Sequence, residues 1–147
     1  MSDDKDDIEI TLASGMAAFE AKQFPKALEL LVPLAEQGQA DAQHRVAIMY
    51  QNGLGCTVKP ELAVQWMRAA AEQGYAVAQH GLGFMYMEGD CVEQSGEQAV
   101  AWFTKAAEQG LAGSQTTLAL MYENGELVPK DPEKAKYWYQ QAGFGGA

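Results

Sequence analysis

Apolar residues recur along this chain at the three- and four-residue spacing of amphipathic α-helices. In residues 39–74 the first apolar stripe consists of Ala42, Val46, Met49 and Tyr50, and the second consists of Ala63, Trp66, Met67 and Ala70. The stripes return in the next stretch as Ala78, Leu82, Met85 and Tyr86 and as Ala99, Trp102, Phe103 and Ala106. They return once more as Ser114, Leu118, Met121 and Tyr122 and as Ala135, Trp138, Tyr139 and Ala142. The pattern predicts a succession of helix pairs, and therefore an all-α protein.

The interval between the copies is 36 residues. The tetrapeptide Ala-Glu-Gln-Gly occurs at residues 35–38, 71–74 and 107–110, and Trp66, Trp102 and Trp138 keep the same spacing. Self-similarity at such an interval is the signature of a solenoid, whose units bury their apolar faces by stacking. We predict one α-solenoid domain over residues 1–147, with repeats at about 39–74, 75–110 and 111–146 and a shorter first unit at about 7–38.

The first unit begins after an acidic segment. Residues 1–6 are expected to form a solvated, frayed tail, and a helix with an apolar face is expected from Ile8 onward. Pro25 is suited to the first turn of the second helix. Pro33 removes a backbone donor inside that helix, which predicts either a bend near residues 29–33 or an early end.

Small residues and tryptophans are expected to shape the core of the repeats. Ala47, Gly83 and Ala119 occupy one column of the first helices and should let a partner helix approach closely. The tryptophan column should fill the space between the helix layers, so that Trp102→Ala is expected to unfold the protein.

The connections between paired helices contain turn and capping signals. Gly53, Gly55, Gly89 and Gly125 suit a backbone with positive φ. Ser95 and Asp131 are typical N-cap residues, whereas Lys59 before Pro60 is a poor one, so we expect the second repeat to fray there first.

The charge of the chain limits its partners. Twenty acidic residues against ten basic ones give a net charge of −10, which argues against nucleic acid and anionic membranes. No stretch approaches the roughly 18 apolar residues of a membrane span, and the acidic start does not resemble a signal peptide. These features predict a cytoplasmic protein.

At residues 76–110 the chain reads Ala-x-Ala-Gln-x-x-Leu-Gly-x-x-Tyr-x-x-Gly, followed by Ala-x-x-Trp-Phe-x-Lys-Ala-Ala-Glu-Gln-Gly. This pattern resembles the Sel-one-like repeat, a relative of the tetratricopeptide repeat, and three copies cover residues 40–146. The first unit departs from it and is closer to a plain tetratricopeptide repeat, because its connection is four residues shorter. The resemblance implies a right-handed superhelix of antiparallel helix pairs, with first helices on the concave face. It also implies an adaptor or scaffold for protein complexes, with no catalytic motif.

Candidate chemistry is sparse. His44 and His80 share a column, but no third metal ligand joins them, and no nucleophile triad, phosphate loop or Cys-x-x-Cys is present. Cys56 and Cys91 are expected to be free thiols, although a bridge between neighbouring connections is conceivable. We therefore expect no enzyme activity, no metal and no cofactor.

A second stripe on the first helices is the predicted partner-binding surface. The predicted contact residues are His44, Arg45, Ile48, Gln51, His80, Phe84, Met87, Glu88, Thr116, Leu120 and Glu123. The apolar row of Ile48, Phe84 and Leu120 would receive a peptide or helix of a partner protein. It could instead pack against neighbouring first helices. An inhibitor, immunity protein or regulatory subunit that blocks a partner enzyme is the alternative function.

Lys136 points to a terminal repeat. It occupies the column of Leu28, Val64 and Val100, and a terminal repeat needs a polar outer face. The glycine-rich residues 143–147 cannot supply a further helix. We therefore expect the solenoid to end with this chain, as a monomer or small homo-oligomer.

Overall fold

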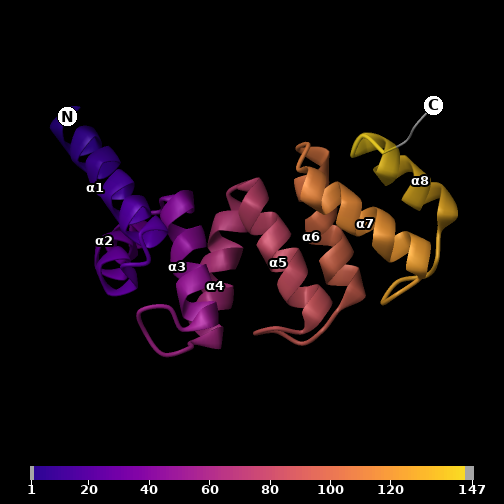
Figure 1. Cartoon of the computed structure of the whole chain (residues 1–147), viewed down its shortest axis with the longest axis horizontal. Helices are drawn as coiled ribbons and strands as arrows, with labels where there is room; N and C mark the ends of the chain where they lie inside the picture. The colour runs from indigo at the N-terminus through magenta and orange to yellow at the C-terminus, as the bar shows by residue number, and fades with distance from the viewer. Residues whose placement is uncertain (1, 145–147) are drawn as a thin grey trace. The chain divides into compact units, whose positions relative to one another are not determined.

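The structure, a computed structural model, describes residues 2–144, with side chains from residue 5. Within this range the chain forms eight α-helices and no strand, in the order shown in Figure 1. The helices are α1 (Ser2–Glu20), α2 (Phe24–Glu36), α3 (Ala40–Asn52), α4 (Pro60–Glu72), α5 (Ala76–Glu88), α6 (Gly96–Glu108), α7 (Ala112–Asn124) and α8 (Pro132–Gln141). The predicted all-α fold with paired helices is confirmed.

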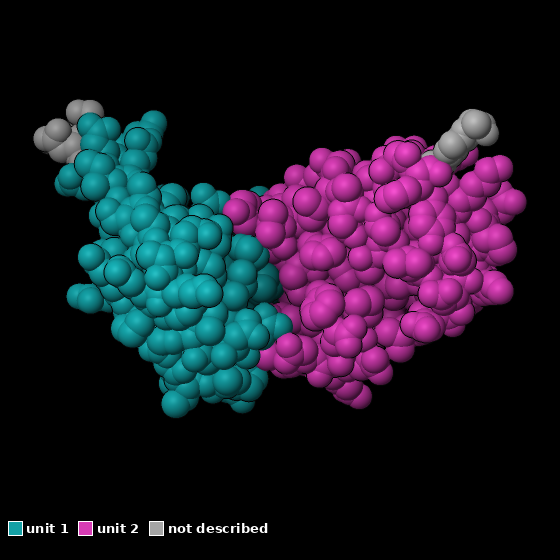
Figure 2. Space-filling model, in the orientation of Figure 1, with its two compact units in different colours: residues 1–73 teal, residues 74–147 magenta. Residues whose placement is uncertain are grey.

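The helices group into two compact units, residues 1–73 and residues 74–147 (Figure 2). The division falls at the predicted boundary between the second and third repeats. In each unit the helices pack consecutively, as α1 with α2, α2 with α3 and α3 with α4, and as α5 with α6, α6 with α7 and α7 with α8. Each helix therefore buries its apolar stripe mainly against its neighbours in sequence, as repeat proteins do.

The first unit corrects the predicted start of its first helix and excludes one of the two alternatives predicted for its second helix. α1 begins at Ser2, so the acidic segment belongs to the helix, whose N-terminal dipole favours negative charge. α2 continues through Pro33 to Glu36 and does not end early. Leu31, Leu34 and Ala35 of α2 remain buried against Val46 and Met49 of α3, and this packing offsets the cost of the proline.

The burial of the tryptophans in both units corrects their predicted role in the core. The aromatic side chain that is completely buried is Phe103, whereas Trp102 is half-buried and lies beneath the Lys105 ammonium, 4.9 Å from the ring centroid. Trp66 is likewise half-buried, and Trp138 alone of the three is buried. The expected close approach at Gly83 is confirmed, because a Cβ there would lie 2.8 Å from Cδ1 of Phe103.

Glutamines from the repeated Ala-Glu-Gln-Gly segment connect successive repeats. The Gln73 side-chain amide donates to the carbonyl oxygen of Gly38 at 3.0 Å and to the side-chain oxygen of Gln43 at 2.8 Å. In the second unit Gln109 donates in the same way to Gly74 and Gln79, each at 2.9 Å. Gln43 and Gln79 are buried whereas Gln73 and Gln109 are exposed, so each bond between two glutamines satisfies a buried amide oxygen and helps to fix the register of helix against helix.

The connections follow the predicted turn and cap chemistry. Gly53, Gly89 and Gly125 end their helices in the left-handed conformation. Ser95 and Asp131 accept hydrogen bonds from the backbone amides of Gln98 and Lys134, whereas Lys59 makes no side-chain cap bond. The expected difference in capping is therefore confirmed.

Candidate interaction surface

Two exposed apolar side chains occupy equivalent positions on first helices of the second unit. Phe84 on α5 is 45% exposed and Leu120 on α7 is 44% exposed, while the residues that follow them, Met85 and Met121, are buried. An exposed side chain beside a buried one places the two on different faces of the helix. Phe84 and Leu120 therefore lie outside the unit's core and are available for contact.

His80 lies one turn before Phe84 and connects α5 to α7. Its Nδ1 atom is 2.7 Å from Oγ of Ser114, and its ring lies 5.2 Å from that of Phe103. Burial lowers the pKa of the His80 imidazole, which favours the neutral form at neutral pH. His80 therefore contributes to the packing of α5 against its neighbours, and it does not present a positive charge to a partner at neutral pH.

The other predicted contact residues of this unit differ in exposure. Glu88 is exposed and Thr116 is half-buried. Met87 is half-buried against the unit's core, and its carbonyl oxygen accepts a hydrogen bond from Gln94 at 2.9 Å. Glu123 is exposed and accepts a hydrogen bond from the Tyr139 hydroxyl, which raises the pKa of that phenol. The carboxylate of Glu123 is thus already engaged with α8.

In the first unit the predicted contact residues are buried, half-buried or engaged in contacts within the protein. His44 is only 8% exposed, so its expected place on an open face is wrong, because the surrounding helices cover it. Arg45 pairs with Glu20 at 3.1 Å and lies 4.7 Å above the Phe19 ring. Ile48 and Gln51 are half-buried. The exposed apolar part of the predicted row therefore belongs to Phe84 and Leu120.

The described residues offer little reactive chemistry. No group of three or more His, Cys, Asp or Glu side chains among them could hold a metal ion. Cys56 and Cys91 are free and half-buried; burial raises the pKa of both thiols, and for Cys91 the value reaches about 11 with a contribution from Asp90. Such thiols are poor nucleophiles at neutral pH. Among residues 2–144 no helix has the length and apolar character to cross a membrane.

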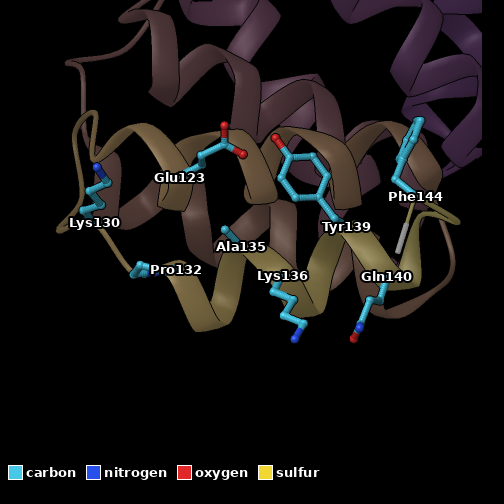
Figure 3. Close-up of a pocket in the computed structure, with 8 residues that line it drawn as sticks. All are labelled: Glu123, Lys130, Pro132, Ala135, Lys136, Tyr139, Gln140 and Phe144. Carbon is cyan, nitrogen blue, oxygen red and sulfur yellow. The ribbon is translucent and has the colours of Figure 1, made fainter. Parts of the chain in front are cut away.

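A pocket on the second unit was not predicted from the sequence. It has a volume of about 660 Å³ and lies along α8, with Glu123 of α7 on one side and Phe144 at one end (Figure 3). We call it the α8 groove. The sequence contained one indication of a special surface here, because Lys136 replaces Val64 and Val100 of the earlier repeats. This replacement predicted a polar end face but not a groove.

The family model of the Sel1 repeat matches residues 40–75, 76–111 and 112–143. These limits agree within a few residues with the three predicted repeats. None of the curated proteins compared with the chain matches it.

Solved structures match most of the chain. A Sel1 repeat protein from Oxalobacter formigenes is 32% identical over 92% of this chain and 54% of that protein, with a TM-score of 0.83. A protective antigen of uropathogenic Escherichia coli strains, which displays an SLR fold, is 40% identical over 82% of this chain and 26% of its own, with a TM-score of 0.76. MamA, at 18% identity with a TM-score of 0.64 over 96% of this chain and 79% of its own, shows the fold alone. The chain thus spans only part of the first two relatives, and its fold is an α-solenoid of helix pairs.

Proposed function

We propose that this chain, which belongs to the Sel1 repeat family, is a protein-binding module and that Phe84 and Leu120 form the centre of its contact face. Sel1 repeat proteins are generally protein-interaction scaffolds, and the fold is typically non-enzymatic. The resemblance predicts that the first helices line the concave face, and Phe84 and Leu120 lie on the first helices α5 and α7. The expected partner segment is a peptide or a helix.

The exposure of Phe84 and Leu120 at equivalent repeat positions is the observation that carries this proposal. Complete burial of a Leu or Phe side chain stabilises by about 1.5–3 kcal/mol. Since each of these side chains is already more than half covered, a partner would gain about 1 kcal/mol from each. Two such anchors, 36 residues apart and on neighbouring first helices, favour an extended or helical segment over a compact ligand.

Polar groups near the anchors would set specificity. Glu88 is exposed on α5, and Thr116 lies one turn before Leu120 on α7. A polar rim around a small apolar centre excludes water from the anchors without adding much affinity itself. The net charge of −10 disfavours nucleic acid as the occupant of this face.

Charge insertion at the anchors tests the proposal. The immobilised protein, its Phe84→Glu and Leu120→Glu variants and a Tyr137→Glu control would be compared for the proteins that they retain from a cell extract, identified by mass spectrometry. Tyr137 is a suitable control because it is 52% exposed and lies on α8. We expect a partner to be retained by the parent and the control and lost by both anchor variants, with equal thermal unfolding of all four.

Two results would count against this function. A partner that both anchor variants retain in full would place the contact elsewhere on the protein. Loss of helical signal in Phe84→Glu and Leu120→Glu alone would show that these residues serve the fold.

A further inference from the structure

The α8 groove combines an apolar floor with charged edges. Ala135, Tyr139 and Phe144 supply apolar surface, and Lys130, Lys136 and Glu123 supply charge. In Figure 3 the Tyr139 ring lies between Glu123 and Phe144, and Lys130 lies at the opposite end of the groove from Phe144. The groove is thus open and elongated along the helix.

Its apolar end is held in place by the backbone. Gly143 takes a positive φ of 92°, which turns the chain back, and the Phe144 amide donates to the Tyr139 carbonyl oxygen at 2.8 Å. The Phe144 ring meets the Tyr139 ring edge-on at a centroid distance of 6.4 Å. Phe144 is nevertheless 69% exposed, so a large aromatic surface is fixed but not covered.

The preceding repeat shows what kind of element fits such a face. Residues of α8 correspond to those of α6 at a spacing of 36, so that Ala135 matches Ala99 and Tyr139 matches Phe103. In α6 these residues are buried in one cluster with Leu118, Ala119 and Met121 of α7. The equivalent face of α6 is therefore covered by a helix that presents an apolar stripe.

The charges of the groove select among helices. Three of the four lysines in residues 74–147 lie within residues 130–136. The same segment contains Asp131, which caps α8, and Glu133, and neither of these acids lines the groove. Lys134 lies over the Tyr122 ring, whereas Lys130 and Lys136 line the groove. Glu123 already accepts the Tyr139 hydroxyl hydrogen bond. The groove thus presents two lysines to an occupant and attracts carboxylates.

We propose that the α8 groove docks an amphipathic helix of a partner protein that carries acidic residues beside its apolar stripe. Tyr139 and Phe144 receive the stripe, and Lys130 and Lys136 pair with the carboxylates. Neither Phe84 nor Leu120 lines the groove, so substitutions at the anchors and in the groove test the two proposals through different residues.

Two synthetic helical peptides provide the test. Both carry the apolar stripe of α7, and one has Glu and the other has Lys at its polar positions. Fluorescence anisotropy with the whole protein would measure their affinities for the parent and for Lys136→Glu and Phe144→Ser. Lys105→Glu is the matched control, because it makes the same charge change in the same unit outside the groove.

We expect the acidic peptide to bind at least about tenfold more tightly than the basic one, and Lys136→Glu to remove this preference. Phe144→Ser should weaken the acidic peptide, and Lys105→Glu should leave it unchanged. Equal binding of the two peptides, or equal effects of Lys136→Glu and Lys105→Glu, would overturn the proposal. Self-association of the free protein that Phe144→Ser abolishes would also overturn it, by assigning the groove to a second copy.

Discussion

Phe103 is completely buried beside Gly83, whereas its neighbour Trp102 is half-buried under Lys105. Phe103→Ala should therefore lower the free energy of unfolding by about 3–5 kcal/mol, the usual cost of an aromatic cavity in a core. Trp102→Ala should cost clearly less, because solvent already reaches part of the indole. Urea denaturation of both variants measures the difference. Equal losses in the free energy of unfolding would show that Trp102 contributes to the core as much as Phe103 does.

His44 makes stability depend on pH. Burial, and secondarily the charge of Arg45, lowers its pKa from 6.5 to about 4, while Asp41 acts in the opposite direction. Protonation therefore favours the unfolded chain, so the stabilisation is complete above about pH 6.5 and is lost as the pH falls to about 4. The shift corresponds to on the order of 3 kcal/mol.

Replacement of His44 isolates this contribution from that of the carboxylates. The free energy of unfolding of His44→Gln should fall less steeply than that of the parent between pH 6.5 and pH 4. Denaturation curves at successive pH values give both slopes. If the two slopes coincide, His44 does not carry the pH dependence.

The burial of Trp102 and of His44 was predicted wrongly for the same physical reason. Trp102 and Phe103 are adjacent, both apolar and about 100° apart around a helix, so either fits the apolar stripe. The crossing of α6 with its neighbours decides which is buried, and a single helix does not encode that crossing. His44 was assigned to an open face for the same reason, since its cover comes from packing between helices.

At the scale of the element, Gly83 sets how closely α5 and α6 approach. Gly83→Ala should improve the helix propensity of α5 by about 1 kcal/mol, yet its Cβ would lie 2.8 Å from Cδ1 of Phe103. Overpacking of this kind costs about 1–3 kcal/mol, so we expect a net loss of stability. Replacing Phe103 with the smaller Leu should relieve this overpacking. Gly83→Ala should therefore cost less stability when it is added to Phe103→Leu than when it is made in the parent.

Gly113→Ala is the matched control for this substitution. A Cβ at Gly113 on α7 meets only Cε1 of His80, at an ordinary contact distance of 3.7 Å. This variant should be neutral or more stable in thermal unfolding. If Gly83→Ala behaves in the same way, the close approach does not limit the packing of the pair.

Element positions followed from the sequence because independent signals agreed. In the three equal repeats, periodic apolar residues, glycines at the ends of the first helices and caps such as Ser95 defined helices with the predicted spacing. α1 was placed too late because its acidic start has no apolar face, although charge at a helix N-terminus is compatible with helix. The α8 groove depends on the turn at Gly143 that positions Phe144, and no periodic pattern specifies it.

At the scale of the whole molecule, the repeats separate stability from recognition. Buried columns such as Met49, Met85 and Met121 recur with little change, whereas the exposed columns vary from one copy to the next. A solenoid tolerates this variation because each repeat depends mainly on its neighbours. Surface differences between copies, such as Phe84 and Leu120 against the half-buried Ile48, can therefore specify partners without altering the fold.

Site-specific photo-crosslinking tests the central claim most directly. A photoreactive phenylalanine would be placed in turn at positions 84, 120 and 137, and each protein would be irradiated with the partner that the parent retains. We predict crosslinks to the partner from positions 84 and 120 and none from 137. A partner that crosslinks from position 137 and from neither of the other two would contradict the assignment of binding to Phe84 and Leu120.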